Sequence, residues 1–424
     1  MQISVIVIGD ELLIGQVTDT NSGMIARTIA PYGWKVRNVA TVGDNAEDIT
    51  RAIDQAFSLT DVVITTGGLG PTKDDLTKQV LCDYFGGTLQ EDPAVTQNIL
   101  EIFSRRGLTL NRLTAAQALV PTSCRVIQNS VGTAPIMWFE RPDGKVLVSM
   151  PGVPYETRTM LKAEVLPQLL EKYHSDMDIA HATLMVAGFT ESALAETLEP
   201  IENALPAYLH LAYLPKPGLI RLRVDAHGHG GEFVRNEVER VADEIATLLG
   251  TGHVLSRSDL TAAEIMLERL RHKNLTIATA ESCTGGNIAH QLTLIPGASD
   301  VVEGGIVSYS NDVKMRVLGV KSQTLEQHGA VSMETVREMT AGAMAATGAK
   351  LTIATSGIAG PGGGTPDKPV GTVWIAARLD PGFTDHKCVE AWTLGHFTGS
   401  RDRIIDTATT HALLLGIHLI DQIL

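Results

Sequence analysis

A chain of 424 residues is too long for one hydrophobic core, and typical domain sizes predict about three domains. Hydrophobic residues make up 44% of the sequence and charged residues 19%, which are globular proportions and exclude a disordered or low-complexity chain. The formal net charge of −14 disfavours broad binding to nucleic acid or to anionic membranes, because like charges repel.

The sequence also indicates a compartment. It has no run of the roughly 20 apolar residues that a membrane-spanning helix needs. The apolar run 3–8 is followed by Asp10 and Glu11, which predicts a first strand and not a signal peptide. Four cysteines lie far apart without a Cys-x-x-Cys pair, so neither a zinc site nor a disulfide framework is indicated. We expect a cytoplasmic protein.

Residues 1–172 alternate strand-like runs with helical patterns, which predicts an α/β domain of parallel strands joined by crossover helices. The expected strands include 3–8, 61–66 and 146–150, and the expected helices include 22–32 and 47–58. Glycine-rich and acidic turns follow these strands, with GDELL at 9–13 and TTGGLGPTKDD at 65–75. Glycines after a strand let the backbone approach a phosphate closely, although acidic residues beside a helix start more often stabilise the helix dipole.

Residues 173–255 predict a small α+β domain. Its expected elements are strand 183–187, helix 191–204, strands 208–213 and 219–225, and helix 232–249. From 256 to 424 the α/β alternation returns, with helix 262–272, strand 275–280, a helix from 285, strand 301–309, helix 333–347, strands 351–355 and 371–377, and a helix from 401.

The strongest local pattern is ESCTGG at 281–286, directly after an apolar strand and before a helix. Ser282 offers a nucleophile there, and the N–H groups of the turn offer an oxyanion site. By itself a serine in this position is more often a helix N-cap. Two further polar turns, YSNDVK at 309–314 and SGIAGPGGG at 356–364, also follow strands. Because ligands of open α/β sheets bind at the carboxyl ends of strands, we expect the three turns to converge.

These turns, with KPVGTVW at 368–374, closely resemble the C-terminal domain of the CinA family, an α/β nicotinamide-nucleotide amidohydrolase domain. The resemblance covers 256–424 and implies hydrolysis of nicotinamide mononucleotide to nicotinate mononucleotide and ammonia without a cofactor. It implies that Ser282 is the nucleophile, that Lys314 is its base, and that Tyr309 orients or relays the proton. The substrate-binding residues that it implies are Glu281, Thr284, Gly285, Gly286, Asn311, Ser356, Gly357, Gly360, Gly362 and Arg401, and among them Glu281 is expected to position the turn.

The chemistry of these residues agrees with the resemblance. Ser282 is a weak nucleophile at its free pKa, and Lys314 can activate it only if burial lowers the pKa of the amine. Cys283 is the rival nucleophile, but we favour a packing role, since neighbouring residues of a turn point in different directions.

The nucleotide is expected to bind through the backbone. Gly285, Gly286 and the loop 356–364 are expected to hold its phosphate and ribose with N–H groups. Arg401, in a segment FTGSR that resembles the family's Phe-x-Gly-Asp-Arg, is expected to contact the phosphate. Ser400 stands there in place of the usual Asp.

With NSVGTAP at 129–135 and PGVPYE at 151–156, residues 1–172 resemble the N-terminal CinA domain, a three-layer molybdopterin-binding fold. In CinA proteins this domain is associated with metal-dependent ADP-ribose pyrophosphatase activity. The resemblance implies a divalent ion such as Mg²⁺ or Mn²⁺, for which carboxylates are suitable hard ligands. The candidate ligands are Asp10, Asp44, Asp74, Asp75 and Glu156, and the candidate substrate contacts are Asn21, Gly67, Gly68, Gly70, Thr72 and Thr133.

The middle domain, 173–255, resembles the KH-like connector of CinA proteins. Its Gly-x-x-Gly, from Gly228 to Gly231, is predicted to join a strand to a helix, whereas nucleic-acid clamping in KH domains uses such a turn between helices. We therefore interpret the connector as a spacer or dimer element of a homodimer.

Three functional hypotheses remain open. The chain is a bifunctional hydrolase acting on nicotinamide mononucleotide and ADP-ribose, or its N-terminal domain binds a pterin or nucleotide without turnover, or the whole chain is a non-catalytic partner in DNA uptake or damage response. The acidic composition and the presence of Ser282, Tyr309 and Lys314 count against the third hypothesis. We therefore expect small nucleotides as ligands, with membrane binding excluded and nucleic-acid binding disfavoured.

Overall fold

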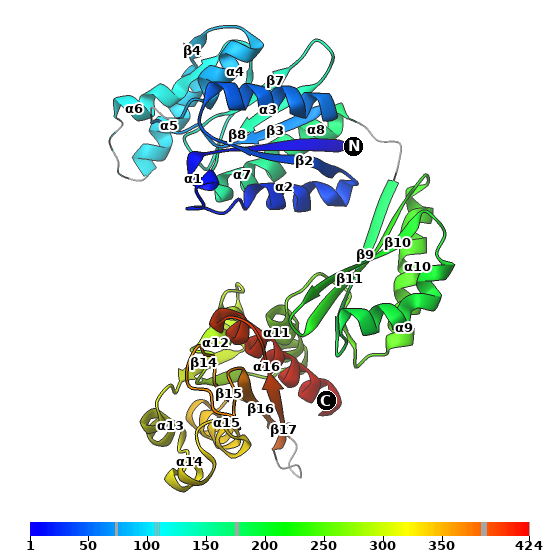
Figure 1. Cartoon of the computed structure of the whole chain (residues 1–424), viewed down its shortest axis with the longest axis vertical. Coiled ribbons are helices and arrows are strands. Elements are labelled where there is room, and N and C mark those ends of the chain that lie inside the picture. The colour runs from blue at the N-terminus through cyan, green and yellow to red at the C-terminus, as the bar shows by residue number, and fades with distance from the viewer. Residues whose placement is uncertain are drawn as a thin grey trace. The chain divides into compact units, whose positions relative to one another are not determined.

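The computed structural model describes residues 1–72, 75–105, 107, 109, 111–173, 178–382 and 388–423. The chain divides into two compact units, Met1–Ile179 with His227–Gly231, and Ala180–Ala226 with Glu232–Leu424. Figure 1 shows the elements of each unit.

The N-terminal unit is built on a six-stranded sheet with the strand order β2-β1-β3-β8-β7-β6. The parallel strands are β1 (Gln2–Ile8), β2 (Lys35–Val42), β3 (Val62–Thr66) and β8 (Val146–Met150). Strands β7 (Ile136–Glu140) and β6 (Arg125–Ile127) extend the sheet in antiparallel fashion. The prediction of parallel strands joined by crossover helices is therefore confirmed.

Helices cover both faces of this sheet (Figure 1). One face carries α2 (Asn21–Ile29), α7 (Pro154–Met160) and α8 (Leu166–Lys172), and the other carries α3 (Ala46–Leu59) and α4 (Thr77–Phe85). Alternation along β1 explains the two layers, because Val5 packs into the first core and Ile6 into the second. Helix α2 is shorter than predicted, since Pro31 cannot continue its hydrogen bonds and the chain passes into the short 3-10 turn Ala30–Tyr32.

A small lobe lies in the chain between α4 and β6. It consists of β4 (Leu89–Glu91), α5 (Pro93–Arg105), α6 (Arg112–Ala115) and β5 (Leu119–Pro121), with β4 and β5 paired as an antiparallel ribbon. Val95, Ile99 and Ala118 form its own apolar cluster.

The middle part of the chain forms a four-stranded sheet with the order β10-β11-β9-β12. Its elements are β9 (Asp178–Ala187), α9 (Glu191–Ala204), β10 (Leu209–Lys216), β11 (Leu219–Gly228), α10 (Gly231–Leu249) and β12 (Val254–Ser256). The Gly-x-x-Gly segment joins β11 to α10, which confirms that it connects a strand to a helix.

The C-terminal part holds a five-stranded sheet with the order β14-β13-β15-β16-β17. Strands β13 (Ile277–Glu281), β14 (Val302–Val307) and β15 (Leu351–Gly357) are parallel, and β16 (Thr372–Leu379) and β17 (Val389–His396) are antiparallel. One face packs against α11 (Ala262–Lys273), α12 (Asn287–Thr293) and α16 (Arg401–Ile423), and the other faces α13 (Asn311–Leu318), α14 (Ser322–His328) and α15 (Met333–Thr347).

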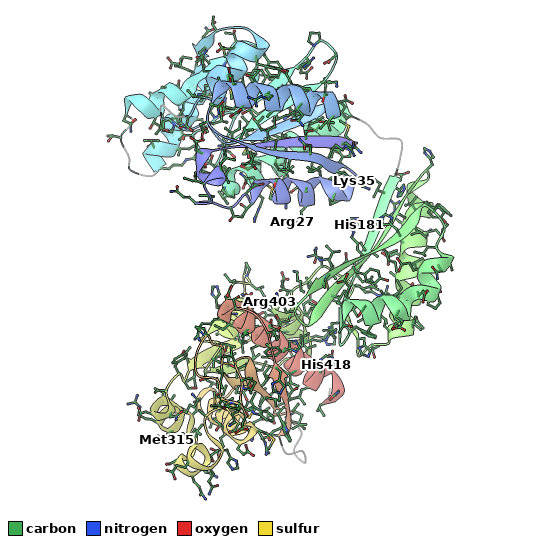
Figure 2. The ribbon with its side chains drawn as sticks, in the orientation of Figure 1. Arg27, Lys35, His181, Met315, Arg403 and His418 are labelled. Atoms are coloured by element: carbon green, nitrogen blue, oxygen red, sulfur yellow. The ribbon has the colours of Figure 1, made fainter. Side chains whose placement is uncertain are left out.

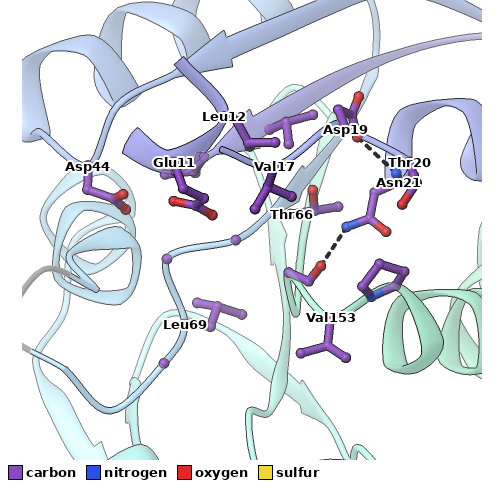
Figure 3. Close-up of a pocket in the computed structure, with 18 of the residues that line it drawn as sticks. Glu11, Leu12, Val17, Asp19, Thr20, Asn21, Asp44, Thr66, Leu69 and Val153 are labelled. Carbon is purple, nitrogen blue, oxygen red and sulfur yellow. Dashed lines mark hydrogen bonds between the residues drawn. The ribbon is translucent and has the colours of Figure 1, made fainter. Parts of the chain in front are cut away.

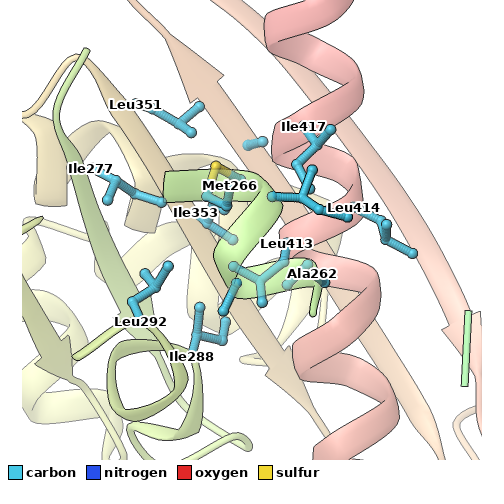
Figure 4. Packing of buried hydrophobic residues seen from close by; sticks show 14 of the residues in the cluster. Ala262, Met266, Ile277, Ile288, Leu292, Leu351, Ile353, Leu413, Leu414 and Ile417 are labelled. Atoms are coloured by element: carbon cyan, nitrogen blue, oxygen red, sulfur yellow. The ribbon is translucent and has the colours of Figure 1, made fainter. Parts of the chain in front are cut away.

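The core of the C-terminal sheet continues into the middle sheet. Figure 4 shows Met266 of α11 and Ile417 of α16 packed against Ile353 of β15. The same cluster includes Leu219 and Leu255 from the middle part of the chain. The connector and the C-terminal domain therefore share one hydrophobic core.

A glycine in the middle of α16 permits this packing. A Cβ atom on Gly416 would lie 2.7 Å from Met266 Cε and 2.8 Å from Ile353 Cδ1. Such distances require the neighbouring side chains to shift, so the helix accepts a glycine despite its low helix propensity.

We predict that Gly416→Leu destabilises the C-terminal unit by about 1–3 kcal/mol, because extra methylene groups in a packed core force side chains off their rotamers. Differential scanning calorimetry should show a lower melting temperature for the unit. The control is Gly416→Ala, in which a gain in helix propensity of about 1 kcal/mol opposes the shift of two flexible side-chain ends. Equal melting temperatures for the two variants would contradict this account of the packing.

Candidate functional site

Ser282 lies at the carboxyl end of β13, in the turn that leads to α12. Its N–H donates to the Thr355 carbonyl of β15 at 3.0 Å, which holds the turn against the neighbouring strand. The residue is only 8% exposed. The nucleophile candidate is therefore fixed by the sheet.

Lys314 comes from the next strand connection. Strand β14 ends at Val307, two residues earlier than predicted, and Ser310 caps α13 by accepting from the Val313 N–H at 3.2 Å. One turn into α13, the Lys314 side chain reaches inward and is 1% exposed. Its Nζ lies 2.9 Å from Ser282 Oγ.

The surroundings of Lys314 suit either protonation state. Nζ also lies 2.8 Å from the Ser308 carbonyl oxygen and 3.4 Å from that of Tyr309. A neutral amine can donate its two N–H groups to these carbonyls and direct its lone pair at the Ser282 hydroxyl. A protonated amine can donate to all three oxygens. Burial lowers the pKa of Lys314, because charge is disfavoured away from water.

A fully buried carboxylate organises the turn beside this pair. Glu281 accepts hydrogen bonds from the backbone N–H groups of Gly286, Ile288 and Ala289 at 2.9–3.0 Å. The hydroxyls of Thr279 and Thr284 donate to it at 3.0 and 2.7 Å. The carboxylate therefore binds the start of α12, where it also complements the helix dipole.

This arrangement corrects the expectation for the glycine turn. The Gly286 N–H, expected to bind phosphate, is used by Glu281, and the Gly285 N–H donates to the Ser282 carbonyl at 3.2 Å. Thr284 is 3% exposed and also pairs with the Thr355 hydroxyl at 2.7 Å. Glu281 and Thr284 thus position the turn, and neither presents a polar group to a ligand at the surface.

Tyr309 and Arg401 meet at the surface near the pair. An Arg401 guanidinium nitrogen donates to the Tyr309 hydroxyl at 3.0 Å, and another donates to the Gly360 carbonyl at 2.5 Å. The Tyr309 side chain is 63% exposed, and its backbone carbonyl, not its hydroxyl, contacts Lys314. Among the described hydrogen bonds, none joins the Tyr309 hydroxyl to Lys314 or to Ser282. The expected proton-relay role of this hydroxyl therefore has no direct contact to support it.

The remaining candidates divide between the sheet and the loop. Ser356 is 1% exposed and donates to the Ala330 carbonyl at 2.7 Å, so its hydroxyl does not face a ligand. Gly357 pairs with Val373 of β16, and a Cβ atom there would lie 2.6 Å from a Val373 methyl group. Gly362 lies in open space, and Asn311 is exposed at the start of α13.

Cys283 is a packing residue in this structure. It is 6% exposed and belongs to the apolar cluster of Ile288 and Leu292. Burial raises the pKa of its thiol to about 12, which leaves little thiolate at neutral pH. The preference for Ser282 over Cys283 as nucleophile is consistent with this environment.

A second candidate site is a cavity of about 420 Å³ in the N-terminal unit, at the carboxyl ends of β1 and β3. Figure 3 shows Glu11 and Asp44 at one end of it and Asp19 and Asn21 at the other. The predicted residues that line it are Asn21, Asp44, Gly67, Gly68, Gly70 and Asp75. The Asn21 amide donates to the Gly152 carbonyl at 2.8 Å, which joins two walls of the cavity.

Two glycines allow the chain to pass close to β1 and to the start of α4. Gly67 has φ +106°, and a Cβ atom there would lie 2.0 Å from the Ile8 carbonyl oxygen. Gly68 has φ +63°, and its Cβ atom would collide with the Thr77 hydroxyl. Only glycine fits both positions, so the loop approaches the cavity floor without side chains.

The acidic residues in and beside this cavity have different surroundings, and Asp10, a predicted ligand, does not line it. Asp10 and Asp44 exchange hydrogen bonds between carboxylate and backbone N–H at 3.0 and 3.2 Å. Burial and the nearby carboxylates of Asp10, Glu11 and Asp75 raise the pKa of Asp44, although the Asp10 N–H opposes this. Repulsion among these carboxylates would be relieved by a bound cation.

Asp75, a predicted metal ligand, lies two residues before α4, which begins at Thr77. Its carboxylate instead accepts from the Gly70 N–H at 2.7 Å and from the Thr72 N–H at 2.9 Å, and the Thr72 hydroxyl also donates to it. Asp75 therefore closes the glycine-rich loop, and Thr72 is part of this closure.

Other N-terminal candidates lie elsewhere. The Glu156 carboxylate accepts from the Asn129 amide at 2.7 Å and lies against Gly132, so it joins the two later motifs to each other. Neither Glu156 nor Thr133 lines the cavity. Asp74 lies outside the described residues. Within the described part of the chain, no group of three His, Cys, Asp or Glu residues is arranged to hold a metal ion.

Three family models match the chain in order. The probable molybdopterin binding domain matches residues 4–171, the damage-inducible protein CinA KH domain matches 181–252, and the CinA C-terminal domain matches 259–420. A CinA-like protein of Chloroherpeton thalassium is 43% identical over 378 residues, which cover 88% of this chain and 89% of that protein. The chain belongs to the CinA family. A second CinA-like protein, from Flavobacterium psychrophilum, is 38% identical over 417 residues and 97% of both chains.

The CinA assignment fits the described architecture. The three-layer unit is the molybdopterin-binding fold, the middle sheet with α9 and α10 is KH-like, and the remainder is the CinA C-terminal domain. The crystal structure of a CinA protein from Thermoplasma acidophilum is 34% identical and covers 39% of this chain and 96% of that one, with a TM-score of 0.36. Among the described helices of this CinA chain, none has the length and apolar character to cross a membrane.

Several residues that line the CinA N-terminal cavity were not among the predicted site residues. They are Glu11, Asp19, Thr20, Thr66, Val153 and Pro154, and they come from the same strand ends as the predicted residues. The sequence indicated these residues only through their position beside predicted site residues. The direction of each side chain in an irregular turn cannot be predicted from the sequence of the turn.

Proposed function

We propose that this CinA chain is a bifunctional hydrolase of pyridine nucleotides. Its C-terminal domain would hydrolyse the carboxamide of nicotinamide mononucleotide, and its N-terminal domain would cleave the pyrophosphate of ADP-ribose with a divalent ion. The observation that carries the first activity is the 2.9 Å contact between Lys314 Nζ and Ser282 Oγ, both buried. No carboxylate of a described residue forms an ion pair with Lys314 that would keep it charged.

The proposed reaction uses Ser282 and Lys314 in two halves. Ser282 Oγ attacks the carboxamide carbon while its proton moves to the neutral Lys314 amine. The tetrahedral intermediate then collapses, the C–N bond breaks, and Lys314 returns the proton to the leaving nitrogen, which departs as ammonia. Water attacks the resulting ester, again with Lys314 as base, and nicotinate mononucleotide leaves as Ser282 recovers its proton.

The turn also supplies candidates for stabilising the oxyanion. The N–H groups of Ser282, Gly285 and Gly286 are bound to Thr355, Ser282 and Glu281. This leaves Cys283 and Thr284 as the residues of the turn whose N–H groups we assign to the oxyanion. Arg401 is assigned to the nucleotide phosphate, since its guanidinium lies at the surface between the Tyr309 hydroxyl and the 356–364 loop.

The N-terminal proposal requires a cation, and the described carboxylates fit only part of a site. Asp44 and Glu11 present hard oxygen ligands to the cavity, while Asp75 is engaged with the loop. Mg²⁺ commonly takes only one or two protein carboxylates and completes its shell with substrate phosphates and water. Asp44 and Glu11 would then hold the ion, which would neutralise the pyrophosphate oxygens. A pterin or nucleotide binder without turnover is the alternative for this cavity.

We predict that Ser282→Ala abolishes release of ammonia from nicotinamide mononucleotide. Loss of the nucleophile of a serine protease lowers kcat on the order of 10⁶-fold, and a similar loss is expected here. Cys283→Ala, which removes the adjacent buried thiol, is the matched control and should retain most of the activity. An active Ser282→Ala variant would refute the proposed nucleophile.

The pH dependence of the amidase should follow Lys314. Since burial lowers its pKa, kcat/KM should rise with pH through an apparent pKa below about 10.4, the value of an exposed lysine, and fall as the amine becomes protonated. Lys314→Arg should be nearly inactive, because guanidinium keeps its proton. Lys321→Arg, an equivalent change at an exposed site, is the control. Near-normal turnover of Lys314→Arg would show that Lys314 is not the base.

The N-terminal activity should be separable from the amidase. Asp44→Asn removes one charge from the cavity and should greatly reduce metal-dependent cleavage of ADP-ribose, measured by release of AMP, without changing ammonia release. Asp83→Asn, an exposed change on α4, is the control. A chelator should act as Asp44→Asn does. If it also stopped ammonia release, the metal-free serine mechanism would be wrong.

A further inference from the structure

A basic groove lies on the N-terminal unit, apart from the cavity at the ends of β1 and β3. Its volume is about 650 Å³, and three cations line it: Arg27 of α2, Arg158 of α7, and Lys162 of the π-helical turn Leu161–Val165. Figure 2 labels Arg27 on α2. Tyr32, 47% exposed, lies at the same groove, and no acidic residue lines it.

The charges of this basic groove are not balanced locally. Among the ion pairs formed by the described residues, none involves Arg27, Arg158 or Lys162, although acidic residues outnumber basic ones in the chain by 48 to 34. Arg158 and Lys162 are four positions apart, and like charges at that spacing destabilise a helix. The π-helical turn that carries Lys162 is a rare feature that occurs frequently at functional sites.

We propose that the basic groove binds the phosphate group of a small nucleotide. Guanidinium groups recognise phosphate oxygens with paired hydrogen bonds, and an ammonium adds a compact charge, so Arg27, Arg158 and Lys162 together match a phosphate dianion. The Tyr32 ring offers a face on which a base stacks. A nucleic-acid strand is disfavoured as the ligand, because its many phosphates would meet the net charge of −14.

This site goes beyond the proposed hydrolase function and does not rest on it. The groove is nevertheless connected to the first cavity, since α2 and α7 extend between them. Asn21 at the start of α2 and Pro154 at the start of α7 line the cavity, whereas Arg27 and Arg158, later in the same helices, line the basic groove. A ligand in the groove therefore contacts the two helices that frame the cavity.

The test is equilibrium dialysis of the full chain with AMP, inorganic phosphate and adenosine as probes. The double variant Arg158→Gln/Lys162→Gln should bind AMP about tenfold more weakly, since each exposed ionic contact contributes up to about fivefold in affinity. The control Arg51→Gln/Arg105→Gln removes two exposed cations elsewhere on the same unit and should bind as the unaltered chain does. Tyr32→Ala should weaken binding of AMP but not of phosphate.

Three results would overturn the proposal. These are equal affinity of the double variant and the control for AMP, equal affinity of the unaltered chain for adenosine and AMP, and an affinity of Arg27→Gln for AMP equal to that of the unaltered chain. Arg27→Gln alone serves as a second variant if the double variant does not fold by circular dichroism. Ammonia release and ADP-ribose cleavage, measured on the same samples, report separately on the hydrolase proposal.

Discussion

The C-terminal site depends on a carboxylate that has been removed from water. Glu281 is fully buried, and a buried charge is tolerated only when hydrogen bonds compensate for its lost hydration. Three backbone N–H groups of α12 and two threonine hydroxyls provide that compensation. Because Glu281 ends β13 and its donors begin α12, the interaction fixes the intervening turn and with it the position of Ser282.

The same interaction limits where a ligand can bind. A helix start beside a nucleophile commonly serves as an anion site, but here the protein's own carboxylate uses it. The exposed positive charge of the site comes instead from Arg401, which belongs to the last helix of the chain. Ser282 and Arg401 are thus carried by elements at opposite ends of the domain sequence, and Arg401 donates to the loop carbonyl of Gly360.

Much of this arrangement was predictable from sequence. The alternation of elements gave the α/β class, and three polar turns after strands indicated one edge of a sheet, which brings Ser282 and Lys314 together. The direction of individual side chains was not predictable. Ser356 was expected at the site, yet its hydroxyl donates to the Ala330 carbonyl. Side chains alternate between the two faces of a strand, and tertiary packing decides which face the last residues of the strand use. The role of Asp75 in closing a loop was not predictable either, because a carboxylate near a helix start can accept from any nearby unpaired N–H group.

The connector and the C-terminal domain share one hydrophobic core, which affects what happens when the chain is cut between them. Leu219 and Leu255 belong to the same apolar cluster as Met266 and Ile417. A protein cut just before α11 would lose the first two residues and leave part of the surface of α11 and α16 in contact with water. A free-standing C-terminal domain therefore needs polar residues in place of the apolar ones on that surface. Cutting the chain at the domain boundary does not by itself give a domain with a polar surface.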